Sequence, residues 1–381
     1  MQAEYILAFS DSQDYVDTMN DLIGIRVKAL REERKLSQDE LAAVFGFKDR
    51  QTVSAIENGD RRVSANELLR AMAALKVPLE YFTDPFMLVG EGQFSWRQSE
   101  VPAEKLRGFE RSAGRLIAAY RNYATQVGRQ PKIVRPTLRL TAQSKFEHAM
   151  ADGERFVVDY QLGDAPAERL AEVMESKLGI LVLMVDAIDG VSGAACRLRD
   201  LDAVLINRNE IVGRRNFDLA HELFHILTWD AMPPDPVEDN SEFSKKRVEQ
   251  LANNFAGAIL MPESALDRLG PWEKDTVRRL NKGALLLGVT ANALKWRLVA
   301  TGRLEKATAA EIDDVGLRNN GRAAKTTKVP ALFSKTFMEV ISLALTKGLL
   351  SMRRASELLG VDVEDVSDLC TTYGLEAQDE L

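Results

Sequence analysis

Two of the three histidines in this 381-residue chain stand four residues apart. They are His221 and His225 in the segment FDLAHELFHILTW, where apolar residues all round predict a buried helix. On a helix this spacing puts both imidazoles on one face, so both can bind one metal ion. Glu222, which stands between the two histidines, projects beside that ion. The pattern predicts a zinc site capable of hydrolysis.

A catalytic zinc site needs three protein ligands and one open position, so a third ligand must come from elsewhere in the chain. Glu249 is the best candidate, because it opens a stripe with Ala252, Asn253 and Ala256 on the next predicted helix, VEQLANNFAGAILMP. The small side chains of that stripe would let the two helices approach closely. We therefore expect the Glu249 carboxylate to reach the zinc ion.

The segments VLIN (204–207), RRNFDLAHELFH (214–225) and ExxANxFAxxxLMP (249–262) follow one another in the chain. In this order they resemble the ImmA/IrrE-type metallopeptidases. The resemblance implies a zinc cofactor on His221, His225 and Glu249, with Glu222 as the general base. We also expect the strand ending in Asn207 to present an edge on which an extended substrate pairs. A zinc-bound module for docking or sensing is the alternative to proteolysis.

A second motif is SQDELAAVFGFKDRQTVSAIENGDRR, residues 37–62. Ser37 and Glu40 form a capping box at the start of one helix, and Gly46 ends it before a second short helix. Two helices joined in this way predict a helix-turn-helix, whose second helix can lie in a major groove. The segment resembles the Cro/repressor-like (XRE-type) DNA-binding domain. Its spacing from Gly46 to Ser54 is one residue longer than is common there, which leaves the register of the recognition helix open by one position.

The helix-turn-helix prediction assigns contacts to double-stranded operator DNA, which the protein would bind as a homodimer on an inverted repeat. Side chains near helix ends are expected to hold phosphates: Gln38, Arg61 and Arg62. Side chains at the start of the second helix are expected to reach base edges: Arg50, Gln51, Thr52 and Ser54.

Hydrophobic patterns place these motifs in an α+β, mostly helical chain with a small β-sheet. Strands are predicted at 179–185, 191–198 and 202–207, and helices at 102–127, 143–151, 166–178, 212–228 and 242–260. We expect a helix-turn-helix domain at 21–83, a linker with a basic helix at 84–140, a metallopeptidase domain at 141–305, a linker at 306–328 and an acidic helical region at 329–381.

The net charge of −7 would by itself argue against a nucleic-acid binder. The charge is unevenly distributed, however. Residues 21–140 carry 21 basic and 15 acidic side chains, whereas residues 141–262 carry 12 and 21, and residues 329–381 carry 4 and 9. The acidity therefore belongs to the segments expected to meet proteins, and the last one is suited to dimerisation or to docking a basic partner.

The sequence shows no signal peptide and no apolar run long enough for a membrane span, so a cytoplasmic location is expected. Its two cysteines are far apart and suggest neither a disulfide framework nor a cysteine zinc site.

Three functional hypotheses remain: an autorepressor with a fused zinc-dependent peptidase-like domain, an antitoxin that neutralises a neighbouring toxin, and a stress-activated endopeptidase that cleaves a repressor.

Overall fold

The computed structural model describes residues 11–234, 242–272, 274–323 and 328–376. The chain divides into two compact units, each of which is described by itself. Unit 1 comprises residues 1–93 and 111–122, and unit 2 comprises residues 94–110 and 123–381. One helix, α6 (Ala103–Gln126), contributes residues to both. Among the described residues, none of the helices has the length and apolar character that crossing a membrane requires.

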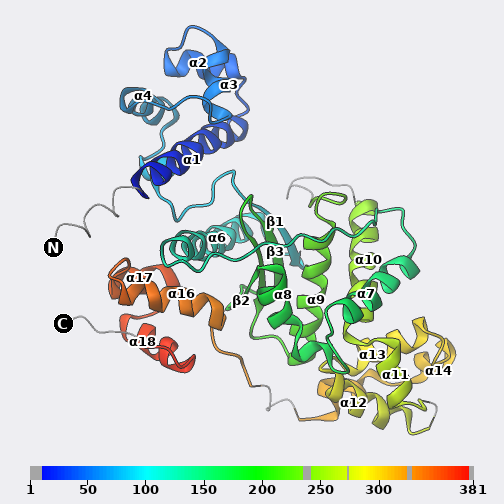
Figure 1. Ribbon diagram of the computed structural model, residues 1–381. Helices are drawn as coiled ribbons and strands as arrows, with labels where there is room; N and C mark the ends of the chain where they lie inside the picture. Colours follow the sequence, from blue (N-terminus) through cyan, green and yellow to red (C-terminus); the bar gives the residue numbers. More distant parts are fainter. Residues whose placement is uncertain (1–10, 235–241, 273, 324–327, 377–381) are drawn as a thin grey trace. The chain divides into compact units, whose positions relative to one another are not determined.

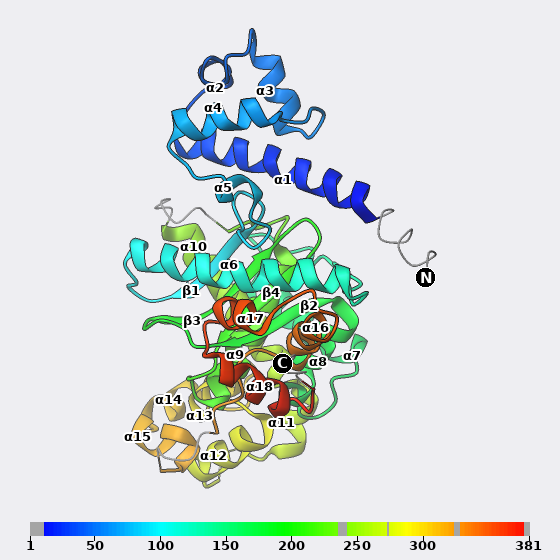
Figure 2. The ribbon, with the colours of Figure 1, turned by 90° about the vertical axis from the view of Figure 1, so that its left-hand side faces the viewer.

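Unit 1 is a bundle of short helices packed on a longer one (Figure 1). Its helices are α1 (Asp11–Glu33), α2 (Gln38–Phe45), α3 (Arg50–Glu57), α4 (Ala65–Leu75) and α5 (Glu80–Thr83). Figure 2 shows α2, α3 and α4 on the same side of α1. Leu41, Phe45, Val53 and Ile56 are buried at the centre of the bundle, as their helical spacing predicts.

The capping box predicted at the start of α2 is present in unit 1. Ser37 accepts a hydrogen bond from the backbone N–H of Glu40, and the Glu40 carboxylate accepts one from the backbone N–H of Ser37 at 2.7 Å. Gly46 ends the helix with a φ of 75°, in the left-handed region that glycine adopts without steric cost. These local signals fix the turn between α2 and α3.

Unit 2 is built around a four-stranded mixed sheet in the order β1-β3-β4-β2. Its strands are β1 (Gln93–Gln98), β2 (Ile180–Val185), β3 (Val191–Arg197) and β4 (Asp202–Asn207). β4 pairs in parallel with β2, with Val182 opposite Val204, and antiparallel with β3, with Ala195 opposite Val204. Nearly every side chain of β2, β3 and β4 is buried, which explains their continuous apolar sequences.

Unit 2 also contains helices that precede and follow strands β2 to β4 in the sequence. They are α7 (Phe146–Asp159), η1 (Pro166–Glu168), α8 (Leu170–Leu178), α9 (Val212–Thr228), α10 (Glu242–Leu260), α11 (Glu263–Leu269), α12 (Thr276–Leu287), α13 (Ala291–Ala300), α14 (Lys306–Glu311), α15 (Asp314–Leu317), η2 (Arg318–Gly321), α16 (Lys335–Thr346), α17 (Met352–Leu359) and α18 (Val363–Thr372). The class is α+β and mostly helical, as predicted, and α9 and α10 have the predicted bounds.

Small residues let the central helices approach their neighbours closely. α9 packs against β3 and β4, and α10 packs against both α7 and α9 (Figure 1). A Cβ atom added to Gly153 of α7 would lie 2.7 Å from the Phe255 carbonyl oxygen of α10. A Cβ atom added to Gly193 of β3 would lie 3.5 Å from Cγ of Glu222 on α9. Glycine at position 153 therefore lets α7 lie close to α10, which carries Glu249, whereas the distance at Gly193 is an ordinary van der Waals contact.

Both segments expected to be linkers contain ordered structure. Residues 84–140 supply β1 as well as the expected basic helix, α6, and residues 306–328 supply α14, α15 and η2. Ala309 and Leu317 lie in the core of unit 2, so the second segment folds as part of that unit. The acidic C-terminal region also joins unit 2: the backbone N–H of Phe333 donates to the Met184 carbonyl oxygen at 2.7 Å.

Candidate metal centre and DNA-binding surface

The structure brings the three predicted zinc ligands together in unit 2. His221 and His225 lie one turn apart on α9, and Glu249 lies on the adjacent α10. One ligand atom from each residue lies within 4.8 Å of the other two. The Nε2 atoms of the two histidines are 3.1 Å apart, and the Glu249 carboxylate is 3.1 Å from His221 Nε2 and 3.4 Å from His225 Nε2. We call His221, His225 and Glu249 the ligand cluster.

Electrostatics adapt the cluster to a cation. Burial lowers the pKa of His221 to about 4, so its imidazole is neutral at pH 7, as a metal ligand must be. Burial opposes ionisation of Glu249, yet hydrogen bonds with both histidines hold the pKa of its carboxyl below the ordinary value. Burial also lowers the pKa of His225, but its hydrogen bond with Glu249, together with the negative charges of Glu222 and Glu249, outweighs this effect and raises it. The neutral imidazole of His221 and the ionised carboxylate of Glu249 are ligands of the kind that suits zinc.

Glu222 is fully buried beside the ligand cluster, and both of its carboxylate oxygens lack a hydrogen-bond partner among the described residues. Burial raises the pKa of this carboxyl to about 8. A buried carboxylate without a partner is costly, because nothing replaces the hydration it loses. A nearby cation and a water molecule would offset that cost, so the environment of Glu222 fits a metal centre.

The sequence did not predict the roles of three residues near His221. Asn253 and Arg97 contact Nδ1, the ring nitrogen on the side opposite the ligand cluster, and Asp218 pairs with Arg97. Asn253 Oδ1 lies 3.1 Å and Arg97 Nη1 lies 2.5 Å from His221 Nδ1. Arg97 Nε pairs with the fully buried Asp218 carboxylate at 2.8 Å. Burial raises the pKa of Asp218 to about 6, although Arg97 opposes this shift.

The sequence contains different amounts of information about these three residues. Asn253 stands in the small-residue stripe of α10, so it could have been found as an orienting partner of a histidine ligand. Asp218 precedes His221 by one helical turn. Arg97 is 124 residues from His221 in sequence and comes from a segment that showed no motif. Only the pairing of β1 into the sheet brings it to the cluster.

A cavity of about 550 Å³ adjoins the ligand cluster. Its lining includes one member of the cluster and mostly polar residues from β1, β3 and nearby loops: Arg97, Gln98, Ser99, Asp189, Gly190, Val191, Ser192, Asn207, Asn209, Glu210, Arg214, Glu249 and Asn253. The cavity lies within unit 2.

Asn207 lines this cavity but does not offer the free strand edge predicted for it. β4 is an inner strand, paired with β2 on one side and β3 on the other, and Asn207 itself stands opposite Val185. The Asn207 side chain donates to the Val191 carbonyl oxygen at 3.0 Å. The prediction of a substrate edge at Asn207 is therefore wrong, because both edges of its strand are occupied.

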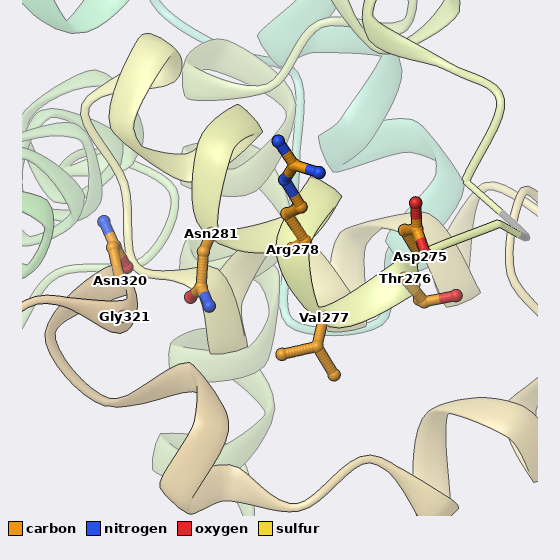
Figure 3. A pocket seen from close by; sticks show the side chains of 7 residues that line it. All are labelled: Asp275, Thr276, Val277, Arg278, Asn281, Asn320 and Gly321. Carbon is orange, nitrogen blue, oxygen red and sulfur yellow. The ribbon is translucent and has the colours of Figure 1, made fainter.

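A second cavity, of about 620 Å³, surrounds the start of α12 (Figure 3). It is lined by Asp275, Thr276, Val277, Arg278, Asn281, Asn320 and Gly321. None of these residues belongs to the predicted site.

In unit 1, α3 begins at Arg50, where the recognition helix was predicted to start. The Asp49 side chain caps it by accepting a hydrogen bond from the backbone N–H of Thr52 at 3.2 Å. Arg50 and Gln51 are exposed in the first turn, whereas Thr52 and Ser54 are half-buried. Two side chains at the start of α3 are thus accessible to a nucleic acid.

The residues predicted to hold phosphates are partly engaged within unit 1. Gln38 donates to the Glu57 carboxylate at 2.9 Å, and Arg61 pairs with Glu67 at 2.7 Å. The Arg61 guanidinium also lies 5.1 Å from the centre of the Phe47 ring. Arg62 is exposed. Phosphates would have to compete with acidic side chains for Gln38 and Arg61.

Comparisons with known proteins agree with the two units. A family model described as a helix-turn-helix matches residues 27–82, and one described as an IrrE N-terminal-like domain matches residues 176–298. The chain joins a helix-turn-helix domain to an IrrE-like domain, and the first of these indicates DNA binding. No curated protein matches the chain.

Two solved structures show low similarity. A Mycobacterium tuberculosis transcriptional regulator is 18% identical over 47% of this chain, with a TM-score of 0.30, and the chain spans 50% of its length. The apo form of the competence regulator ComR from Streptococcus vestibularis is 13% identical, with 94% of this chain and 99% of that chain covered and a TM-score of 0.16.

Proposed function

We propose that this protein is a DNA-binding transcriptional regulator whose IrrE-like domain binds one zinc ion and hydrolyses a peptide bond. The carrying observation is the environment of Glu222. Its carboxylate is buried without a hydrogen-bond partner among the described residues, beside three residues that can together hold a metal. A structural helix would gain nothing from such a carboxylate, whereas a hydrolytic site requires one.

The donor set supports zinc as the metal. Two imidazoles and one carboxylate are the ligands of many catalytic zinc sites, and they leave a fourth position open. The Glu249 side chain is 47% exposed and lines the cavity, while His221 and His225 are buried. The open position would therefore be reached from the cavity side. Zinc bound there would supply a Lewis acid that polarises the scissile carbonyl and lowers the pKa of water to about 7.

The protein's own residues would then carry the proton. Glu222 takes a proton from the attacking water as the bond from that oxygen to the carbonyl carbon forms. It passes the proton to the amide nitrogen as the carbon–nitrogen bond breaks, so that the leaving group departs as an amine. A pKa raised by burial suits this exchange, because the carboxyl has to accept and release a proton near neutral pH.

Replacing Glu222 tests the proposed hydrolysis. The zinc-loaded protein is incubated with an unbiased peptide mixture, and cleavage products are identified by mass spectrometry. Glu222→Gln should reduce cleavage by about 10²–10⁴-fold, because the general base is lost. Its zinc content should remain that of the parent, because Glu222 is not a ligand. Equal cleavage by the variant and the parent would exclude the proposed role.

The regulator part of the proposal rests on unit 1. Its exposed Arg50 and Gln51 are available to base edges, and a dimer would place two such helices in successive major grooves of an inverted repeat. The simplest target is the operator of the protein's own gene, which makes the chain an autorepressor. A homodimer in solution and protection of its own promoter are the expected observations.

The acidic end of unit 2 favours a second candidate function, that of an antitoxin. Glu364, Asp365 and Asp368 are exposed on α18 and would suit a basic protein partner. Under this proposal, expression of the neighbouring gene alone arrests growth and co-expression restores it. Neutral replacements of the three acids would then remove the rescue while leaving DNA binding intact.

A further inference from the structure

We propose that Arg97 is a substrate-binding residue of the cavity beside the ligand cluster, where its Nη2 group donates hydrogen bonds to an oxygen of a bound peptide. This inference rests on the proposed function, which brings a peptide to that cavity. The oxygen belongs to a main-chain carbonyl or to a carboxylate. A guanidinium recognises both, because it presents hydrogen-bond donors in a fixed planar array.

Arg97 is held in place before any ligand binds. Its Nε pairs at 2.8 Å with Asp218, whose side chain is fully buried, and its Nη1 lies 3.4 Å from Asn253 Oδ1. The guanidinium also lies 5.9 Å from the centre of the Phe217 ring. An arginine fixed in this way loses little conformational freedom when it binds a ligand, so its hydrogen bonds contribute more to affinity.

One face of this anchored group remains available. Nη2 makes no hydrogen bond with the part of the chain that the structure describes, although Nε and Nη1 are both engaged. The Arg97 side chain is 25% exposed and lines the cavity together with Glu249. The protein thus presents unused donors in the same cavity that reaches the ligand cluster.

The role of Arg97 Nη1 depends on the tautomer of His221. His221 Nδ1 faces an acceptor, Asn253 Oδ1, and a donor, Arg97 Nη1, so its tautomer decides which of the two it bonds. When Nε2 of a histidine serves as a metal ligand, Nδ1 carries the hydrogen and donates to the acceptor. Arg97 Nη1 then has no acceptor on His221 and keeps Asn253 Oδ1 at 3.4 Å, so Nη2 is the donor left for the peptide.

The backbone also fixes the position of Arg97. β1 is an edge strand next to β3, and the backbone N–H of Ser99 donates to the Gly190 carbonyl oxygen at 2.9 Å. Arg97 lies outside both segments matched by the family models, residues 27–82 and 176–298. The connecting segment, and not the IrrE-like domain, therefore supplies the substrate-binding group.

Peptide binding by the full-length protein tests this inference without requiring turnover. Zinc-loaded Glu222→Gln protein is equilibrated with a random N-acetylated octapeptide library, made once as free acids and once as C-terminal amides. Retained peptides are quantified by mass spectrometry. Arg97→Gln in this background should reduce retention by roughly tenfold, the effect of one charge-assisted hydrogen bond. The matched control is Arg155→Gln on α7, which removes a guanidinium that is 67% exposed.

The two libraries distinguish the oxygen. Equal retention of acids and amides assigns Arg97 to a main-chain carbonyl, whereas retention of acids alone assigns it to a carboxylate. Zinc content is measured for each variant, and Arg97→Lys, which keeps the positive charge, is included in case Arg97→Gln loses zinc. The inference is overturned if Arg97→Gln and Arg155→Gln retain equal amounts of peptide at equal zinc content. It is also overturned if the Glu222→Gln protein without a further substitution retains no peptide. Arg97-dependent retention without cleavage by the Glu222-containing protein overturns the proposed hydrolysis and leaves this inference standing.

Discussion

The two units hold their functional side chains in opposite ways. In unit 2, His221, His225 and Glu222 are buried, and they meet Glu249 from a neighbouring helix. In unit 1, Arg50 and Gln51 are exposed on a single short helix. The buried site is organised before its ligand arrives, whereas the exposed surface has to be organised by DNA. The geometry of unit 2 therefore supports a proposal about chemistry, whereas that of unit 1 supports only a proposal about the kind of partner.

The acidic side chains of the two units also have different roles. Carboxylates in unit 2 orient functional groups: Asp218 fixes Arg97, and Glu249 approaches both histidines. Carboxylates in unit 1 would instead compete with DNA under the proposed phosphate contacts, because Glu57 and Glu67 bind the side chains of Gln38 and Arg61. Disrupting an orienting contact should cost function, and disrupting a competing one should cost only stability.

The largest effect among these tests is expected at the orienting partner of a metal ligand. Asn253→Ala should weaken zinc binding by about 10–100-fold, because His221 loses the acceptor that fixes its ring. The control is Asn254→Ala, since the Asn254 side chain donates to the Gln250 carbonyl oxygen of its own helix and to no other group among the described residues. Competition with a zinc-binding dye measures both affinities. Equal affinities in the two variants would mean that unit 2 is not preorganised through Asn253.

An intermediate effect is expected on the DNA surface. Arg50→Ala and Gln51→Ala should each weaken operator binding by about 5–100-fold and relax sequence preference, because each removes a base contact. The salt dependence of binding should change little, since base contacts displace no counterions. Fluorescence anisotropy with promoter DNA measures affinity against salt concentration, with Lys28→Ala on α1 as the control. A reduced salt dependence in Arg50→Ala would reassign Arg50 to a phosphate.

The smallest effect is expected for the competing pair Arg61–Glu67. A hydrogen bond from Arg61 lowers the pKa of Glu67 from 4.5 to about 2. The pair therefore stabilises unit 1 above pH 4.5, and its contribution is lost as the pH falls through about 2. Because Arg61 is 38% exposed, Glu67→Gln should lower the free energy of unfolding by only about 0.5 kcal/mol at pH 7.

Urea unfolding at pH 7 and pH 2.5 measures this difference, with Glu80→Gln on α5 as the control. The gap between Glu67→Gln and the parent should narrow at the lower pH. Operator affinity should not fall, because the substitution frees Arg61 for phosphate. A loss of affinity at unchanged stability would show that the pair orients Arg61 rather than competing for it.

The sequence predicted those features that depend on interactions between residues close together in the chain. The ligand cluster was predictable because His221 and His225 follow the period of one helix and Glu249 begins a stripe of small residues on the next. The α2–α3 turn was predictable because Ser37, Glu40 and Gly46 act locally.

Long-range pairing was not predictable in this way. Arg97 is part of the candidate site only because β1 joins the sheet beside β3, and nothing in its local sequence indicates that pairing. Strand order, which the local sequence does not indicate, also explains why the predicted substrate edge at Asn207 is wrong. The order of the strands in the sheet decides which strand has a free edge. Ala309 and Leu317 were assigned to a linker because the helices that carry them are short and only tertiary packing reveals their burial.

The central claim is that His221, His225 and Glu249 form a zinc site. Metal analysis of the purified full-length protein tests it most directly, alongside a His225→Ala variant that lacks one ligand. The parent should contain about one equivalent of zinc per chain, and the variant should lose it. Less than about half an equivalent in zinc-supplemented parent protein, or equal zinc in both proteins, would contradict it.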